Sequence, residues 1–392
     1  MLHYKSGDSA AAMLRKMKTC GRKRKKTKSE APPRVPFNED LMMEILLKLP
    51  MKSVMRFKCL SKSWFSLISD PQFARTHFDA AAAPTYRLLN LVKDSEAYSV
   101  DIELALCDDS AHAVTNIPVP SRFDMYGDSL TVAGSCRGFL LVQCLFTDLV
   151  VWNPSTGVQK QIFYNNWSPH HLSGIGYDSL DDDFVVVTVT LAVNNTVVRY
   201  FCLRTNCWSF VECSVRYSQH KLELRHGEFL NGALYWMVKS SDNLRCVIIA
   251  FDVREKRLLE IPMPNHLAVL PKRSEIYYLK AMGEYLALCL VVRNQAPVIE
   301  IWSMKECKVE SFWTKTFVFS SNFGCFLSLI YPICFTKNGE ILAFNGNNTL
   351  VKISDKGKLK YGQQQSRLDF LSCGVYRESF LSLRDDSEKL TK

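Results

Sequence analysis

The sequence predicts an α+β, multidomain protein in which a small N-terminal helical module precedes an all-β propeller of about six blades. Two observations carry this prediction. Residues 35–78 show apolar side chains at helical spacing, whereas the later residues form short β-branched and aromatic runs separated by polar turns. A hairpin pattern also recurs about every 50 residues, which is typical of propeller blades of about four strands.

Residues 1–34 form a basic arm that we expect to be disordered. Residues 1–36 hold eleven basic and two acidic side chains, whereas the rest of the chain holds 38 basic and 37 acidic ones. Nine of the ten net positive charges therefore lie in the arm and the remaining residues are nearly neutral, so we expect no nucleic-acid partner for the folded body. One cluster predicts either a nuclear localisation signal or a solvated tail without a specific role: Arg22, Lys23, Arg24, Lys25 and Lys26.

Residues 35–79 predict four short helices. Asn38 is a suitable N-cap for the first helix, and Pro50 ends it. Its apolar stripe consists of Leu41, Ile45 and Leu49, with Met42 and Leu46 beside it.

The second helix is expected over about residues 52–59, with Cys59 in the core and not a nucleophile. Ser61 is expected to cap the third helix and Asp70 the fourth. A unit of this size cannot readily bury a core of its own. It therefore either caps a larger domain or offers an apolar face to a partner.

The segment resembles the F-box, and closely its plant form. The matching words, in register, are Val35-Pro36, Leu41, Glu44-Ile45-Leu46-Leu47, Leu49-Pro50, Lys52-Ser53-Val54, Arg56-Phe57-Lys58-Cys59 and Lys62-Ser63-Trp64. The departures are Val35, Met51 and Ser61, where the pattern usually has Leu, Val and Cys. The resemblance implies a face that binds a Skp-type adaptor, and through it a cullin and RING ubiquitin ligase. That face would contain Pro36, Leu41, Ile45, Leu49, Pro50 and Trp64.

Residues 86–383 carry the repeat, and residues 384–392 are expected to be a tail. Aligned strand ends lie 49 to 51 residues apart, at Trp152, Phe201, Phe251, Trp302 and Ile353. One further step back reaches Ile102, in a weaker copy. A β-sandwich or several small β units is the alternative, but sandwiches lack a 50-residue superperiod. A strand within residues 374–381 is expected to complete the first blade.

This region also resembles the F-box-associated domain of plant F-box proteins, which is related to kelch propellers. The resemblance rests on three words: GSCRGFL (134–140), WNPST (152–156) and YRES (376–379). The diglycine of true kelch repeats is absent, so the propeller is described as kelch-like and its blade number stays open.

The chain shows no catalytic constellation and no metal or cofactor motif. His170 and His171 are adjacent, so their side chains diverge. The run Asp181-Asp182-Asp183 lacks the continuation of a calcium loop and is expected to be a solvated turn. The run Gly174-Ile175-Gly176 lacks the third glycine of a dinucleotide site. We therefore predict a protein that is not an enzyme and needs no cofactor.

Fourteen cysteines at irregular spacing, without a C-x-x-C pair, favour free thiols. No signal peptide is apparent and no run of eighteen apolar residues occurs, so we expect the nucleus or cytoplasm and no membrane partner. Six cysteines in apolar runs are expected to act as small buried hydrophobes: Cys136, Cys144, Cys202, Cys246, Cys289 and Cys334.

Propellers bind their partners through loops, and aromatic side chains often anchor such interfaces. The candidate target-binding residues are Tyr164, Trp167, His170 and Phe323, unless these side chains only cover blade edges. Together the two resemblances imply the substrate receptor of an SCF-type ubiquitin ligase, with an unidentified target protein. The alternatives are an F-box scaffold that binds the adaptor without driving degradation, and a kelch-like oxidase or glycan-binding module.

Overall fold

The computed structural model describes most of the chain after the basic arm. It divides into two compact units, Met1–Ile45 and Leu46–Lys392. The described residues are 39–80, 85–92, 96–106, 113–120, 123, 130–144, 148–163, 171–191, 195–218, 226–242, 245–264, 267–268, 275–292, 298–304, 313–320, 330–336, 338–345, 349–354, 359–361 and 373–383.

Four helices precede the first strand in the described part of the chain, as predicted. None of the described helices is long and apolar enough to cross a membrane. The helices are α2 (Glu39–Lys48), α3 (Met51–Phe57), α4 (Lys62–Ser69) and α5 (Pro71–Ala80).

The helix boundaries follow from capping side chains. The Ser61 hydroxyl accepts a hydrogen bond from the backbone N–H of Trp64 at 3.2 Å, which caps α4. The Asp70 carboxylate accepts one from the N–H of Gln72 at 2.6 Å at the start of α5. Both predicted caps are confirmed, whereas Asn38 lies outside the described residues.

The prediction that Cys59 lies in the core is wrong. Helix α3 ends at Phe57, and Cys59 lies exposed in the turn that follows. The N–H of Cys59 donates to the Arg56 carbonyl at 3.2 Å, and that of Leu60 donates to the Phe57 carbonyl at 3.0 Å. These tight turns end the helix early and leave the thiol facing away from the interior.

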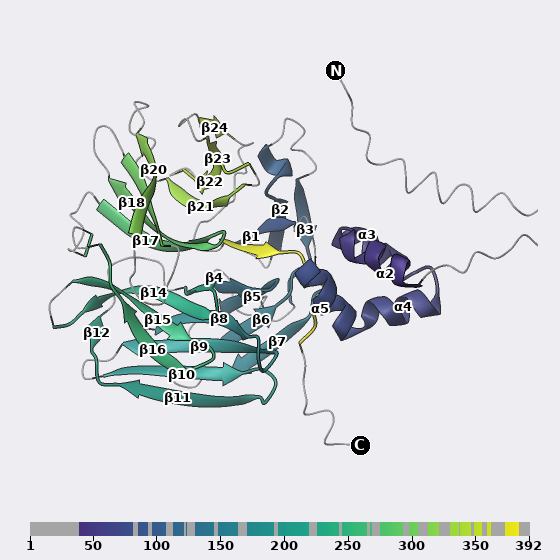
Figure 1. Cartoon of the computed structure of the whole chain (residues 1–392), viewed down its shortest axis with the longest axis horizontal. Coiled ribbons are helices and arrows are strands. Elements are labelled where there is room, and N and C mark those ends of the chain that lie inside the picture. The colour runs from purple at the N-terminus through teal and green to yellow at the C-terminus, as the bar shows by residue number, and fades with distance from the viewer. Residues whose placement is uncertain are drawn as a thin grey trace, which may run out of the picture. The chain divides into compact units, whose positions relative to one another are not determined.

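Six antiparallel sheets follow in the described residues, so the predicted six-bladed propeller is confirmed. Figure 1 shows them in succession from blue through green to yellow. The first three are β25 (Cys373–Arg377), β1 (Tyr86–Val92), β2 (Glu96–Asp101), β3 (Val114–Ile117); β4 (Leu130–Cys136), β5 (Phe139–Cys144), β6 (Asp148–Trp152), β7 (Gln159–Phe163); and β8 (His171–Asp178), β9 (Asp183–Leu191), β10 (Thr196–Cys202), β11 (Cys207–Cys213).

The strands of the last three sheets also pair in chain order from the inner to the outer strand. They are β12 (Tyr217–Ser218), β13 (Glu228–Leu230), β14 (Ala233–Ser240), β15 (Cys246–Asp252), β16 (Arg257–Ile261); β17 (Glu275–Met282), β18 (Tyr285–Val292), β19 (Val298–Met304), β20 (Trp313–Ser320); and β21 (Tyr331–Phe335), β22 (Ile341–Phe344), β23 (Leu350–Ile353), β24 (Leu359–Tyr361). In the fourth sheet two short strands, β12 and β13, both pair with β14.

Each repeat of about 50 residues corresponds to one blade. The five aligned residues lie on the third strand of blades two to six, and Ile102 directly follows the third strand of blade one. These strands carry the aligned residues in the order β6, β10, β15, β19 and β23.

The apolar core lies between neighbouring blades. Val187 and Trp236 belong to the cluster that joins blades three and four, and Ile248 and Leu288 to the one that joins blades four and five. Because each sheet is covered on both faces, strands such as β9 read as continuous apolar runs without alternation.

The predicted buried cysteines divide into two groups. Cys136, Cys144, Cys246 and Cys289 are buried, as expected. The expectation of full burial is wrong for Cys202 and Cys334, which are half-buried. No disulfide bond joins cysteines among the described residues.

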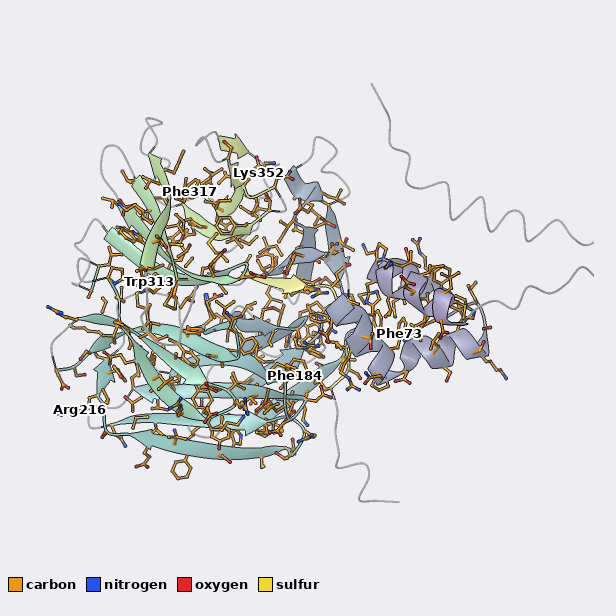
Figure 2. The ribbon with its side chains drawn as sticks, viewed as in Figure 1. Phe73, Phe184, Arg216, Trp313, Phe317 and Lys352 are labelled. Atoms are coloured by element: carbon orange, nitrogen blue, oxygen red, sulfur yellow. The ribbon has the colours of Figure 1, made fainter. Side chains whose placement is uncertain are left out.

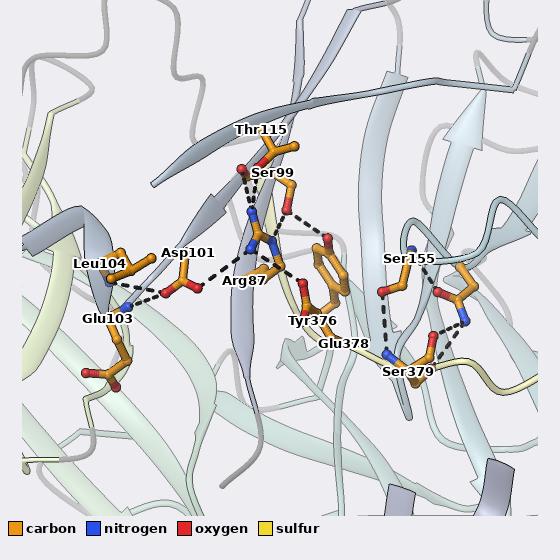
Figure 3. A network of polar contacts seen from close by, with 11 residues as sticks. Arg87, Ser99, Asp101, Glu103, Leu104, Thr115, Ser155, Tyr376, Glu378 and Ser379 are labelled. Atoms are coloured by element: carbon orange, nitrogen blue, oxygen red, sulfur yellow. Dashed lines mark hydrogen bonds and ion pairs between the residues drawn. The ribbon is translucent and has the colours of Figure 1, made fainter. Parts of the chain in front are cut away.

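The C-terminal strand closes the propeller. Strand β25 pairs antiparallel with β1, so Tyr376 lies opposite Arg87. Arg87 is buried between two carboxylates, Asp101 at the end of β2 at 3.6 Å and Glu378 directly after β25 at 3.4 Å (Figure 3). Arg87 also donates to Ser99, whose hydroxyl shares a hydrogen bond with that of Tyr376 at 2.8 Å. The predicted closure is confirmed, with the strand ending at Arg377.

Candidate functional site

Two of the predicted adaptor-binding residues form an exposed apolar pair on α2. Leu41 and Ile45 are four residues apart, so they lie on one helix face, and they are 57% and 51% exposed. Leu46 on the same helix is 1% exposed. The helix therefore presents large apolar side chains to solvent although it also has a buried side.

The other predicted adaptor-binding residues differ in exposure. Pro50 is exposed, whereas Leu49 and Trp64 are half-buried. The Trp64 ring packs on Phe57 with a centroid distance of 5.3 Å. Pro36 lies outside the described residues.

Two exposed apolar residues were missed by sequence reasoning, Leu60 at 53% and Phe65 at 58%. Helix α4 carries Trp64, Phe65, Leu67 and Ile68 within five positions, and only Ile68 is buried among them. Adjacent helical positions cannot all face the same side, so four large apolar residues within five positions were a signal that could have indicated an outward-facing aromatic here.

Helix α5 packs directly against residues of the propeller. Its buried side carries Phe73, which Figure 2 labels, with Ala74, His77 and Phe78. The Phe73 ring stacks on Phe380 with centroids 5.8 Å apart, and His77 lies 4.8 Å from the same ring. Burial lowers the pKa of His77, although its Nε2 lies 2.8 Å from the Leu49 carbonyl oxygen. The neutral imidazole therefore donates to this carbonyl.

Charged side chains reinforce this contact. The Arg137 guanidinium, from the turn after β4, lies 4.7 Å from the ring centroid of Phe78 and 4.4 Å from that of Tyr177. It also pairs with Asp79 at 2.9 Å. The Arg377 guanidinium also lies over the Phe78 ring, 3.9 Å from its centroid. We call Phe78, Asp79, Arg137, Tyr177 and Arg377 the α5 joint.

The three sequence words of the propeller meet beside this joint. Asn153 of WNPST donates from its amide to the carbonyls of Ser379 at 3.0 Å and Leu381 at 3.2 Å. Gly138 of GSCRGFL has φ +86°, and a Cβ there would lie 2.2 Å from the Ser379 hydroxyl of YRES. These words therefore fasten the C-terminal segment to blade two.

The prediction that the run of three aspartates is a solvated turn is right only for Asp181, which is exposed in the turn between β8 and β9. Asp182 pairs with Arg75 of α5 at 2.8 Å and accepts a hydrogen bond from the Tyr177 hydroxyl. Asp183 is buried and accepts a hydrogen bond from the Arg204 N–H at 3.0 Å, and burial raises its pKa. The solvated interpretation is wrong for these two because they anchor neighbouring segments.

The predicted target-binding residues Tyr164, Trp167, His170 and Phe323 lie outside the described residues, as does the basic cluster 22–26. The strands on either side still place the two target candidates in the chain. One segment links β7 to β8 and the other links β20 to β21, so each leads into the inner strand of a blade. The propeller residues of the α5 joint lie at or just after the ends of inner strands: Arg137 follows β4, Tyr177 is near the end of β8, and Arg377 ends β25.

The described residues contain no group of three His, Cys, Asp or Glu side chains placed to hold a metal ion. His171 begins β8, where its Nδ1 lies 2.9 Å from the Thr190 hydroxyl. Gly174 and Gly176 lie within β8, where they give room to Leu234 and Phe229 of the next blade. Both features are accounted for by packing.

Short N-terminal helices followed by a six-bladed propeller define a protein with a helical module and a propeller domain. Sequence profiles identify both parts: the F-box domain matches residues 37–76, and the F-box associated beta propeller domain matches residues 88–378. The chain belongs to the plant F-box proteins with a C-terminal F-box-associated propeller.

Relatives in Arabidopsis thaliana are named as F-box proteins, and one of them is also named as a kelch-repeat protein. The chain is 26% identical to F-box protein CPR1, over 79% of each chain. It is 31% identical to a putative F-box protein, over 58% of this chain and 60% of that one. It is 27% identical to an F-box/kelch-repeat protein, over 70% of this chain and 77% of that one.

Proposed function

We propose that the protein is the substrate-recognition subunit of an SCF-type E3 ubiquitin ligase in the nucleus or cytoplasm. The F-box helices hold a Skp-type adaptor, and through it a cullin, while the propeller holds a target protein for ubiquitination and degradation. Partner subunits carry out the chemistry, so this chain is a receptor and not an enzyme, without a cofactor or a nucleic-acid partner. Its contribution is proximity, which raises the effective concentration of the target at the ligase.

The α5 joint is the observation that carries this proposal. A receptor that works by proximity must hold its target at a defined position relative to the ligase, because a freely rotating tether dilutes the target over a large volume. Arg137 and Arg377 of the propeller make cation–π contacts with Phe78 of α5, and Arg75 of α5 forms an ion pair with Asp182. This contact leaves the opposite end of the propeller for a target.

Exposed apolar residues in the F-box support adaptor binding. Monomeric proteins rarely keep several large apolar side chains exposed on one short segment without a partner. Leu41, Ile45, Leu60 and Phe65 are each more than half exposed within 25 residues.

Co-purification with a plant Skp-type adaptor tests the proposal on the full chain. We expect a stable one-to-one complex, lost in the double variant Leu49→Ala/Pro50→Ala and in Ile45→Asp. Leu180→Asp is the matched control, because Leu180 is 65% exposed but lies in a propeller turn. Adaptor binding that survives in both F-box variants, or fails equally in the control, contradicts the assignment.

The turnover of captured proteins then separates a receptor from a scaffold. A receptor shortens the half-life of a protein that its propeller captures, and the Ile45→Asp variant restores that half-life. Unchanged turnover of every captured protein supports the scaffold.

A further inference from the structure

A cavity of about 410 Å³ lies among the inner strands of the propeller. Its lining comes from β25, β4, β13, β17 and β21, the inner strands of five blades. Val132, Phe229, Ile333 and Val375 supply apolar surface. The volume lies within the range of small-molecule sites, about 300–1,000 Å³, and exceeds what a few ordered waters fill.

Glycines form one wall of this cavity. A Cβ on Gly134 would lie 3.3 Å from the Gly227 carbonyl oxygen, and one on Gly374 would lie 2.6 Å from the Val132 side chain. The Gly227 N–H donates to the Ser173 carbonyl at 2.7 Å. Inner strands of four blades therefore meet closely here, and the wall is fixed by backbone packing.

Three ionisable side chains, His226, Glu228 and Lys280, lie together in the lining of the same cavity. The Lys280 ammonium lies 2.7 Å from one oxygen of Glu228, and the Ala281 N–H donates to the other oxygen at 3.0 Å. His226 Nε2 lies 3.5 Å from the first oxygen. The side chains of His226, Glu228 and Lys280 keep 20%, 11% and 22% of their surface exposed, and all three line the cavity.

The protonation states of the cluster follow from burial and from Lys280. Burial and the neighbouring ammonium lower the pKa of His226 to about 4, so the imidazole is neutral at neutral pH. Burial alone would raise the pKa of Glu228, but the Lys280 ammonium outweighs it and the pKa is lowered. At neutral pH the three side chains thus form one matched ion pair and one neutral imidazole.

The hydrogen-bonding capacity of the cluster points to a class of ligand. Both Glu228 oxygens already accept hydrogen bonds. An ammonium has three N–H donors, and within the described part of the chain Lys280 uses one of them, on Glu228. The spare donors suit an acceptor oxygen. The ion pair is already matched, and Glu103, the other carboxylate in the lining, has an interaction of its own. A charged ligand would therefore add an unpaired charge to a largely desolvated place.

We propose that this cavity binds a small neutral organic molecule, with a hydroxyl or carbonyl head at Lys280 and an apolar body along Val132 and Val375. The pair between Glu228 and Lys280 also joins blades four and five, but that role does not require the open volume beside it. The inference is independent of adaptor binding, since the F-box helices do not line the cavity.

Three probes that share a phenylalkyl group and differ in the charge of the head group test the proposal on the full chain at neutral pH. They are 3-phenyl-1-propanol, 3-phenylpropanoate and 3-phenylpropylamine. Ligand-observed NMR and calorimetric titration measure their affinities. We expect the neutral alcohol to bind at least about tenfold more tightly than the carboxylate and the ammonium. No binding of the alcohol at millimolar concentration, or tighter binding of a charged probe, overturns the proposal.

Two variants locate the site. Val375→Phe fills the cavity and should weaken alcohol binding by about tenfold or more. Val318→Phe is the control, because Val318 is 55% exposed on the outer strand β20 and does not line the cavity. If the circular dichroism of Val375→Phe shows that this variant is unfolded, Ser135→Leu takes its place, because Ser135 also lines the cavity. Binding that is equal in a folded cavity variant and in the control overturns the proposal.

Discussion

Arg137 of the propeller stacks on Phe78 of helix α5, with its guanidinium carbon 4.7 Å from the ring centroid. The Tyr177 ring lies 4.4 Å away and gives the guanidinium a second aromatic contact. The ion pair between Arg137 and Asp79 contributes less than these two contacts, because the Asp79 side chain is 60% exposed and solvent screens it. The planar cation thus joins helix α5 to the propeller.

Replacing Arg137 with alanine should loosen helix α5 while leaving the blades folded. Two cation–π contacts predict a loss of about 1–2 kcal/mol in the free energy of local opening. Hydrogen exchange of the α5 amides measures this loss. Arg254→Ala is the control, because Arg254 is exposed in the turn between β15 and β16. Equal α5 protection in both variants contradicts the proposed joint.

Replacing Arg87 with methionine should destabilise the whole propeller. The Arg87 side chain is 5% exposed, and its loss leaves Asp101 and Glu378 without their shared cation, at 15% and 11% exposure. Removing one partner of a buried ion pair costs about 3 kcal/mol. Arg87→Lys keeps the charge but not the planar fork, so we expect a smaller loss. Urea unfolding measures both, and a lysine variant no more stable than the methionine variant contradicts the role of the charge.

Acid should weaken the propeller partly through His226. The pKa of His226 in the folded protein is lowered to about 4 from its ordinary 6.5. Between these values the unfolded chain binds a proton that the folded chain does not, so the free energy of unfolding falls as pH falls below 6.5. The loss approaches about 1.4 kcal/mol per pH unit for one group.

The variant His226→Gln should flatten this pH dependence, because it removes the titrating group. His77, whose pKa burial also lowers, acts in the same direction in both proteins and cancels in the comparison. Unfolding titrations of both proteins between pH 6.5 and the folded pKa measure the difference. Parallel curves would show that His226 is accessible to protons in the folded state.

The basic arm gives a cellular prediction. Replacing Arg22, Lys23, Arg24, Lys25 and Lys26 with glutamine removes five positive charges from the segment. If the cluster acts as a nuclear localisation signal, the nuclear fraction of a fluorescent fusion should fall severalfold without a change in stability. The matched control replaces the dispersed cations Lys5, Arg15, Lys16, Lys18 and Lys28. Equal distributions in the two variants indicate a solvated tail.

Several elements could be predicted from the sequence because their causes are local or periodic. Ser61 and Asp70 cap helices with hydrogen bonds to residues two or three positions ahead, so the cap is visible within a few letters. The blades repeat at about 50 residues because each one buries equivalent third-strand residues, such as Trp152 and Phe251, between its neighbours.

Other features could not be predicted because they depend on contacts between distant segments. Glu228 and Lys280 are 52 residues apart, and Arg137 and Phe78 are 59 apart, without any periodicity that links them. The sequence predicts that Asp182 is a turn residue, but its ion pair with Arg75 depends on where α5 packs. Cys59 reads as a helical core residue, but α3 ends before it.

The sequence by itself determined the helical module, its apolar pair at Leu41 and Ile45, and a propeller with one blade per repeat. The tertiary structure alone decided how α5 is fastened to the propeller, which carboxylates surround Arg87, and which polar groups face the cavity. The physical reason is the range of the interactions. Caps and strand repeats follow from neighbours along the chain, whereas buried charges are placed by whichever distant segment supplies their counter-charge.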